Sequence, residues 1–181
     1  MPGLSSNSRK ALLELARNSI RGYLATGDPV LPAVEFPELL IKHGCFITLK
    51  TKDGALRGCV GTFDDARPLY ENVARMAIAA SIQDRRFSPL TKEELAGVRI
   101  EISVLGPMEK VQSLDEIEIG RHGIYVKHGA QSGTFLPSVA VEQKWSVAEF
   151  VTFCAREKAG LNPEQCAKAE IYKYEVEKFG E

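Results

Sequence analysis

The chain has 181 residues, of which 44% are hydrophobic and 26% are charged. This length suits one domain over residues 1–181, with room for a smaller lobe, and the composition is ordinary for a globular protein. A formal net charge of -1 gives no general attraction to nucleic acid or to anionic membranes, and the apolar runs are too short to span a bilayer.

Helices are predicted where apolar residues recur every three or four positions, and strands where apolar and polar residues alternate. In chain order, these patterns predict helices over 8–25 and 37–42, strands over 45–51 and 55–63, a helix over 67–83, a short helix from Thr91, a strand over 98–105, turns over 106–123, strands over 124–128 and 133–136 around a loop at 131–133, a helix over 146–159 and a strand over 169–179. Strands joined by hairpins and interspersed with helices indicate an α+β fold, with a mostly antiparallel sheet flanked by helices.

Local signals mark several helix ends. Gly27 suits the position just past the end of the first helix. Thr91 with Glu94, and Ser146 with Glu149, have the spacing of capping boxes, in which each side chain bonds the other residue's backbone amide. These positions are therefore expected to begin helices.

The cysteines and histidines do not form a metal-binding pattern. No Cys-x-x-Cys pair occurs, and no phosphate-binding loop is present. The first residues lack the basic and apolar regions of a secretory signal, so we expect a cytoplasmic protein with reduced thiols. Cys154 lies on the apolar stripe of its helix and is expected to be a core thiol. The cysteines and histidines of the chain are Cys45, Cys59, Cys154, Cys166, His43, His122 and His128.

A cysteine between two glycines follows the first predicted hairpin turn. The segment at 56–61 reads Leu-Arg-Gly-Cys-Val-Gly, and Asp53-Gly54 before it predicts a two-residue turn. Counting back from that turn pairs Lys50 with Arg57, Thr48 with Cys59, and Phe46 with Gly61 on one face of the hairpin. The other face, with Ile47, Leu49, Leu56 and Val60, is expected to face the core.

This register suggests a chemical role for Cys59. Nearby cations favour the thiolate form of a cysteine, and Lys50 and Arg57 are opposed like charges that need an anion or an acidic partner. Gly58 and Gly61 present no side chain, so a ligand could approach the strand closely. We therefore expect Cys59 to be a reactive or ligand-contacting thiol in a cationic cleft. The alternative is that Cys59 is a small residue over which a helix packs.

Three further polar residues are candidates for the same site. Asp84 and Arg86 follow a helix end, where an arginine complements the helix dipole but a carboxylate is unfavourable. A buried ion pair between them is one explanation for Asp84. His122 lies between Gly120 and Gly123 in a turn. It is either a solvated turn residue or, if the fold brings it close to Cys59, a general base.

The segment Leu56-Arg57-Gly58-Cys59-Val60-Gly61 resembles the signature hexapeptide of the AMMECR family, in which the fifth residue is usually isoleucine. Further segments match the family in the same order, and the resemblance covers residues 8–178. Arg85 replaces a common proline, and Ser138 replaces a common glutamine, which argues against a role for a glutamine amide at that position. The matching segments are Asp84-Arg85-Arg86-Phe87, Ile102-Ser103-Val104-Leu105, Gly120-Arg121-His122-Gly123-Ile124, Leu136-Pro137-Ser138-Val139 and Lys158-Ala159-Gly160-Leu161.

The resemblance implies a larger lobe that is built around an antiparallel sheet and contains both termini, plus a smaller lobe. Relatives carry the name AmmeMemoRadiSam system protein A, which implies a link to a Memo-like protein and a radical S-adenosylmethionine enzyme as partners. No reaction or cofactor follows from it. Three functions remain open: an enzyme or enzyme subunit that uses Cys59 and His122, a binding or adaptor module that uses the same cleft, and a nucleic-acid-associated regulator, which the net charge disfavours.

Overall fold

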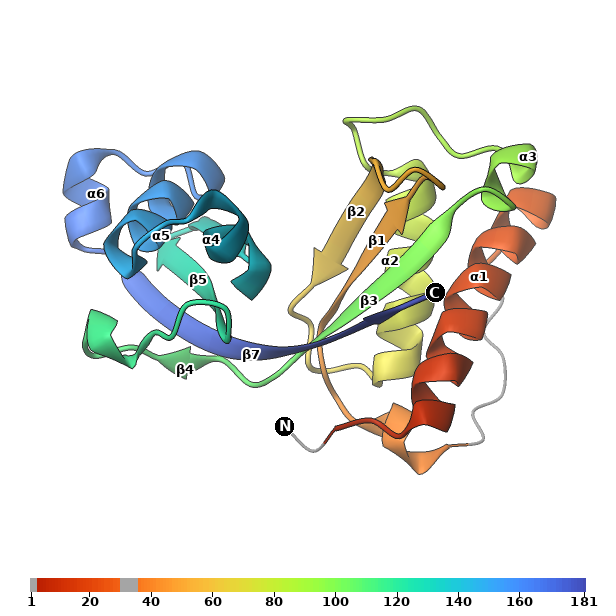
Figure 1. Ribbon diagram of the computed structural model, residues 1–181, viewed down its shortest axis with the longest axis horizontal. Coiled ribbons are helices and arrows are strands. Elements are labelled where there is room, and N and C mark those ends of the chain that lie inside the picture. Colours follow the sequence, from red (N-terminus) through yellow and green to blue (C-terminus); the bar gives the residue numbers. More distant parts are fainter. Residues whose placement is uncertain (1–2, 30–35) are drawn as a thin grey trace. The chain divides into compact units, whose positions relative to one another are not determined.

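The chain folds into two compact units in the computed structural model shown in Figure 1, which describes residues 3–29 and 36–181. Unit 1 comprises Met1–Leu105 together with Glu177–Glu181, and unit 2 comprises Gly106–Val176. Unit 1 therefore includes both ends of the chain, as the family resemblance implies for the larger lobe. The fold is α+β with antiparallel strand pairing throughout the described ladders.

Unit 1 is a small antiparallel sheet covered on one face by helices (Figure 1). Its strands lie in the order β2-β1-β3, with the end of β7 beside β3. The long helices α1 and α2 pack on each other, and α2 also packs on β1 and β2. The elements are α1 (Ser6–Thr26), the 3₁₀ helix η1 (Pro37–Leu40), β1 (Cys45–Lys50), β2 (Leu56–Thr62), α2 (Leu69–Ile82), α3 (Lys92–Leu95), β3 (Arg99–Leu105) and the last residues of β7 (Glu170–Gly180).

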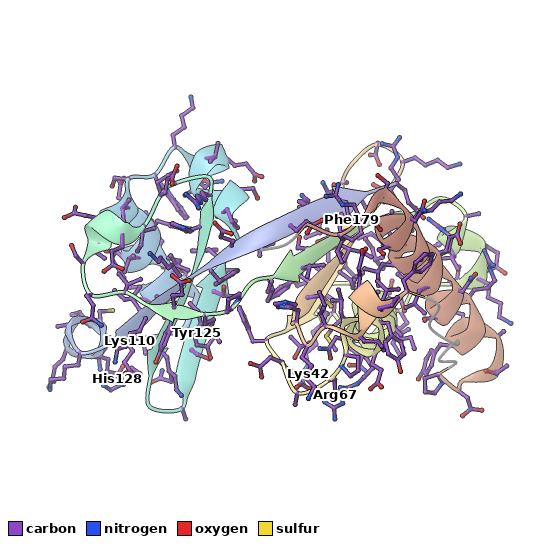
Figure 2. The ribbon with its side chains drawn as sticks, turned by 90° about the horizontal axis from the view of Figure 1, so that it is seen from below. Lys42, Arg67, Lys110, Tyr125, His128 and Phe179 are labelled. Carbon is purple, nitrogen blue, oxygen red and sulfur yellow. The ribbon has the colours of Figure 1, made fainter. Side chains whose placement is uncertain are left out.

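The core of unit 1 follows from strand alternation. Ile47 and Leu49 of β1 are fully buried, as are Ile100 and Ile102, which pair with them on β3. These side chains face α1 and α2, where burial of apolar surface stabilises the sheet at about 25 cal/mol per Å². Phe179 of β7 also packs against this core (labelled in Figure 2).

The helix ends predicted in unit 1 at Gly27 and Thr91 are confirmed. Gly27 adopts a left-handed conformation with φ 81° and donates its amide to the Tyr23 carbonyl, which closes α1. Thr91 and Glu94 form the expected capping box at the start of α3. The helix predicted over 67–83 is α2, but it begins at Leu69, because Pro68 is extended with ψ 147° and precedes the first turn.

The two-residue turn predicted at Asp53-Gly54 is wrong. Thr51 pairs with Ala55 instead, through a hydrogen bond of 2.9 Å from the Thr51 amide, and Gly54 closes the longer loop with φ 90°. This is a type of hairpin loop in which a turn is followed by a left-handed residue. The longer loop shifts the register next to it by one residue.

A bulge in β2 then cancels that shift. Lys50 pairs with Leu56 and Leu49 with Gly58, so Arg57 is the extra residue between them. The predicted pair of Lys50 with Arg57 is therefore wrong. Beyond the bulge, the predicted pairs of Thr48 with Cys59 and of Phe46 with Gly61 are confirmed. Leu56 is 41% exposed rather than in the core, because it lies before the bulge on the face of Lys50.

Unit 2 is a second antiparallel arrangement with its own apolar core. β7 lies between β4 and β5, and β5 also pairs with β6. The largest fully buried side chains of this unit include Phe150, Tyr174 and Ile124. The elements are β4 (Glu109–Lys110), the 3₁₀ helix η2 (Leu114–Glu116), β5 (His122–His128), β6 (Gln131–Phe135), α4 (Pro137–Gln143), α5 (Val147–Phe153), the π-helix η3 (Cys154–Lys158), α6 (Pro163–Ala167) and β7.

The loop predicted at residues 131–133 is part of strand β6 instead. His128 pairs with Gln131, so the turn consists of Gly129 and Ala130, and Gly129 has φ 60°. The prediction also lacked α4, α6 and the short elements between 106 and 123, which are all brief. Short elements carry too little periodicity for a sequence pattern to reveal them.

The end of unit 2 confirms the prediction for residues 146–159. Ser146 and Glu149 form the capping box of α5, the helix continues as η3, and Gly160 ends it with φ 66°. Cys154 is fully buried, so its interpretation as a core thiol is confirmed. Among the residues that the structure describes, no helix is both long enough and apolar enough to cross a membrane.

Candidate functional site

The candidate site lies on the face of the unit 1 sheet that α1 and α2 leave uncovered. Side chains alternate along β1, so Thr48 and Lys50 point away from buried Ile47 and Leu49. Thr48 pairs with Cys59 across the hairpin, and the Thr48 Oγ1 atom lies 3.3 Å from the Cys59 Sγ atom. Cys59 is half-buried. We call this surface, made by Thr48, Lys50 and Cys59, the thiol face.

Both backbone polar groups of Cys59 are held by the motif that follows α2. The Cys59 amide donates to Asp84 Oδ2 at 2.8 Å, and the Cys59 carbonyl accepts from Arg86 Nη2 at 3.4 Å. β2 is the last strand of the unit 1 order, so the outward amide and carbonyl of Cys59 have no neighbouring strand. Asp84 and Arg86 therefore cap a sheet edge that would otherwise offer unpaired backbone groups.

Asp84 and Arg86 form the expected ion pair, although only the acid is buried. Asp84 Oδ2 lies 2.7 Å from Arg86 Nη2, and the two side chains are 7% and 55% exposed, respectively. The hydrogen bond from Arg86, followed by the backbone amides of Cys59 and Arg86, holds the pKa of Asp84 well below its usual range, although burial opposes this. Asp84 is therefore ionised at neutral pH.

The cations that were expected to surround Cys59 each have a carboxylate partner. The Arg57 guanidinium bonds both oxygens of Glu94 at 3.2 Å and the Ser88 carbonyl at 3.0 Å, and its side chain is only 13% exposed. Lys50 pairs with Glu101 of β3 at 2.8 Å. Arg86 is paired to Asp84 as well, whereas Glu101 is shared between Lys50 and Lys178. Each expected cation therefore has an acidic partner within the protein.

The two glycines of the hexapeptide have packing reasons within the fold. A Cβ atom on Gly58 would lie 2.3 Å from the Ala80 carbonyl oxygen, so α2 occupies the space that a side chain would need. A Cβ atom on Gly61 would lie 2.2 Å from the Phe46 ring. The space beside both glycines is therefore filled by protein atoms, and close approach of a ligand is not needed to explain them.

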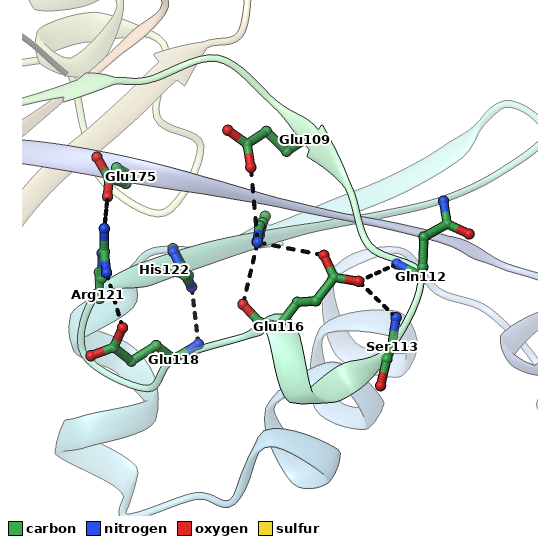
Figure 3. Close-up of polar contacts among 9 residues, drawn as sticks. Glu109, Gln112, Ser113, Glu116, Glu118, Arg121, His122 and Glu175 are labelled. Atoms are coloured by element: carbon green, nitrogen blue, oxygen red, sulfur yellow. Dashed lines mark hydrogen bonds and ion pairs between the residues drawn. The ribbon is translucent and has the colours of Figure 1, made fainter.

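His122 belongs to unit 2, whereas Cys59 belongs to unit 1. Its Nδ1 atom accepts the Glu118 amide at 2.9 Å and so closes a tight turn (Figure 3). Burial, followed by the charges of Lys173 and Arg121, lowers the pKa of His122. In a neutral imidazole only one ring nitrogen accepts, and here that nitrogen is already used. His122 is thus held as a structural acceptor, which leaves no free lone pair for a general base.

Sequence reasoning placed Thr48 opposite Cys59, but it missed two residues of the site: Glu94 and Glu101, the acids that pair with Arg57 and Lys50. The alternation of the strand over 98–105 places Glu101 on the polar face, which is a signal that could have indicated it. Glu94 carried a recognised role as a helix cap, and it serves both purposes. Within residues 3–29 and 36–181, no cluster of three or more potential metal ligands is found.

We expect thiol-specific labelling to separate the four cysteines into two classes. Burial raises the pKa of Cys45 and of Cys154 to about 12, so both are neutral and shielded at pH 8. Cys59 and Cys166 are half-buried. In the native protein a reagent should label only these two, and denaturant should release all four, as peptide mass spectrometry can measure. Because its neighbouring cations are paired, Cys59 should react no faster than a free cysteine. Native labelling of Cys45 or Cys154 would contradict the packing described.

Comparisons with known proteins agree with this architecture. The family model described as AMMECR1 matches residues 13–179. Protein MK0488 of Methanopyrus kandleri is 40% identical over 94% of this chain and 86% of its own length, and Protein NEQ441 of Nanoarchaeum equitans is 38% identical over 94% of this chain and 98% of its own. The crystal structure of an uncharacterized protein, PH0010 of Pyrococcus horikoshii, superposes with a TM-score of 0.88 at 37% identity, covering 94% of this chain and 90% of that one. The match over nearly the whole chain, in sequence and in fold, shows that this protein belongs to the AMMECR1 family.

Proposed function

We propose that this protein is a binding module that recognises a partner protein through the thiol face of unit 1. The observation that carries the proposal is the double hold on the Cys59 backbone by Asp84 and Arg86. It fixes a half-buried thiol at one position next to Thr48. The Asp84 and Arg86 side chains that hold it also pair with each other. Such an arrangement supplies a rigid, preorganised surface, which lowers the entropic cost of association.

The charge pairing supports binding over bond-making. A nucleophilic cysteine is activated by an adjacent base or by unpaired cations. Here Arg57, Lys50 and Arg86 are each paired with a carboxylate, and the Thr48 hydroxyl is no base at neutral pH. The thiol face instead combines the Lys50–Glu101 ion pair with the half-buried Cys59 thiol, and many protein interfaces likewise mix charged and apolar groups.

An enzyme subunit that uses Cys59 is the second candidate. One observation favours it: Cys59 is half-buried, and Asp84 and Arg86 hold its backbone in place. A catalytic thiol needs a fixed position of this kind. In that role a partner would have to supply the base, because His122 already accepts the Glu118 amide. The two candidates differ in what they require of the sulfur atom.

The partners to be tested first are those that the family resemblance implies, a Memo-like protein and a radical S-adenosylmethionine enzyme. We expect at least one of them, purified and immobilised, to retain this protein. Thr48→Arg should weaken that retention by about tenfold or more, because an unpaired charge buried at an interface costs at least about 1.4 kcal/mol. Cys59→Ser should bind within about twofold of the unmodified protein if the sulfur does no chemistry.

The matched control is Asn7→Arg, which adds the same charge at an exposed position of α1. It should leave retention unchanged, and thermal unfolding should show that both variants are folded. Retention of neither partner would count against this choice of partners, and equal retention of Thr48→Arg would rule out the thiol face. Normal binding by Cys59→Ser, combined with complete loss of function in a complementation assay, would favour the enzyme candidate.

A further inference from the structure

Unit 1 has a pocket of about 320 Å³ between the second half of α1 and the short helix α3. Figure 1 shows these two helices side by side. The pocket lies among residues that take no part in the thiol face. Its size is at the lower end of the range of roughly 300–1,000 Å³ that is typical of small-molecule sites. A ligand of this pocket would therefore be small.

The walls of the pocket are apolar. Leu24 and Ala25 contribute from α1, and Leu95 and Ala96 contribute from α3 and the residue after it. Leu95 is buried and belongs to the core of unit 1, so this wall is fixed in place. An apolar ligand group placed here would contact a rigid surface.

Among the residues that the structure describes, the charged ones that line the pocket are all cations: Arg17, Arg21 and Lys92. Arg17 is structural, since its guanidinium donates to the Leu95 carbonyl at 2.9 Å and the Val98 carbonyl at 2.7 Å and pairs with Glu181. Its contacts hold α1 against the segment that follows α3. Arg21 and Lys92 have no comparable structural contacts across the pocket.

Arg21 and Lys92 have side-chain hydrogen-bond donors that are free to bind a ligand. Within the described part of the chain, Arg21 makes one side-chain hydrogen bond, to Asn18 on its own helix, and Lys92 makes no hydrogen bond or ion pair. Lys92 is exposed on the single-turn helix α3, and its charge also acts on neighbouring Glu93. Its ammonium group is therefore accessible to a further anionic partner.

We infer that this pocket binds a small organic anion, with its charged group between Arg21 and Lys92 and its apolar body against Leu24 and Leu95. Two cations on facing elements can hold a phosphate or carboxylate from both sides through charge-assisted hydrogen bonds. The apolar side chains of the pocket favour a ligand with a short carbon body over a bare inorganic ion. The inference is independent of the proposed partner binding, which uses other residues.

The probe for the test is phenyl phosphate, followed by NMR of the leucine methyl groups in the full chain. We expect saturable shifts at Leu24 and Leu95, and a dissociation constant that the double variant Arg21→Gln/Lys92→Gln raises by about tenfold or more. Lys10→Gln removes an exposed cation from the same helix and should leave the constant unchanged. Arg17 is left intact, because its loss would disturb the fold.

Phenol and inorganic phosphate test the two halves of the inference separately. Each should bind more weakly than phenyl phosphate, since each lacks one of the two matching groups. Absence of a saturable shift with phenyl phosphate would overturn the inference, and so would an unchanged dissociation constant in the double variant. Equal binding of phenol would refute the anion site, and equal binding of inorganic phosphate would refute the apolar part.

Discussion

Replacement of Asp84 by alanine is expected to lower the free energy of unfolding by about 2–4 kcal/mol. The carboxylate is 7% exposed, accepts the Cys59 amide and pairs with Arg86, so its removal leaves a sheet-edge amide unpaired and frees the arginine. Asp84→Asn keeps an acceptor and should lose less, about 1–2 kcal/mol. Chemical denaturation at pH 7 measures both changes. An Asp84→Ala variant as stable as the unmodified protein would contradict the capping role.

The matched control is Arg85→Ala, because Arg85 is exposed and stands between the two paired residues. It should change stability by no more than about 0.5 kcal/mol. The pKa of Asp84 is lowered in the folded state, so the stability that its charge contributes is fully present above the unfolded pKa of about 3.9. It is lost as the pH falls below that value. The difference between the unmodified protein and Asp84→Asn should therefore shrink from pH 7 to pH 3, and an increase toward pH 3 would refute this assignment.

Gly58→Ala is expected to lower the free energy of unfolding by about 1–3 kcal/mol. The new methyl group would lie 2.3 Å from the Ala80 carbonyl oxygen, which is backbone and can move only if α2 shifts. Gly61→Ala should cost less, because its new contact is the ring of Phe46, a side chain that can rotate. Thermal or denaturant unfolding of the two variants gives the ranking.

Gly97→Ala serves as the control for these glycine variants, since the nearest atom to its new methyl group would be 3.4 Å away. Its stability should stay within about 0.5 kcal/mol of the unmodified protein. The comparison also bears on function. If Gly58→Ala were fully stable but could not support partner binding, the glycine would be required by a ligand rather than by α2, and our interpretation of the hexapeptide would be wrong.

Much of the secondary structure could be predicted because its signals are local. Helix α1, its end at Gly27, the capping boxes at Thr91 and Ser146 and the alternation of the strand over 98–105 all depend on residues within a few positions of each other. The pairing of Thr48 with Cys59 was also predicted correctly, although the turn was not. The hairpin loop is one residue longer than predicted, and the bulge at Arg57 adds one residue to β2. The two register shifts cancel, so the predicted register holds at Cys59.

The sequence by itself determined the α+β architecture, the core thiol at Cys154 and the family resemblance. The tertiary structure decided the character of the site. The partners of Lys50, Arg57 and Cys59 are 51, 37 and 25 residues away along the chain, so no local pattern contains them. Packing of α2, α3 and β3 against the hairpin brings Asp84, Glu94 and Glu101 to Cys59, Arg57 and Lys50, respectively. Charges that look unpaired in sequence are thereby neutralised, because a charge that leaves water is stable only beside a partner.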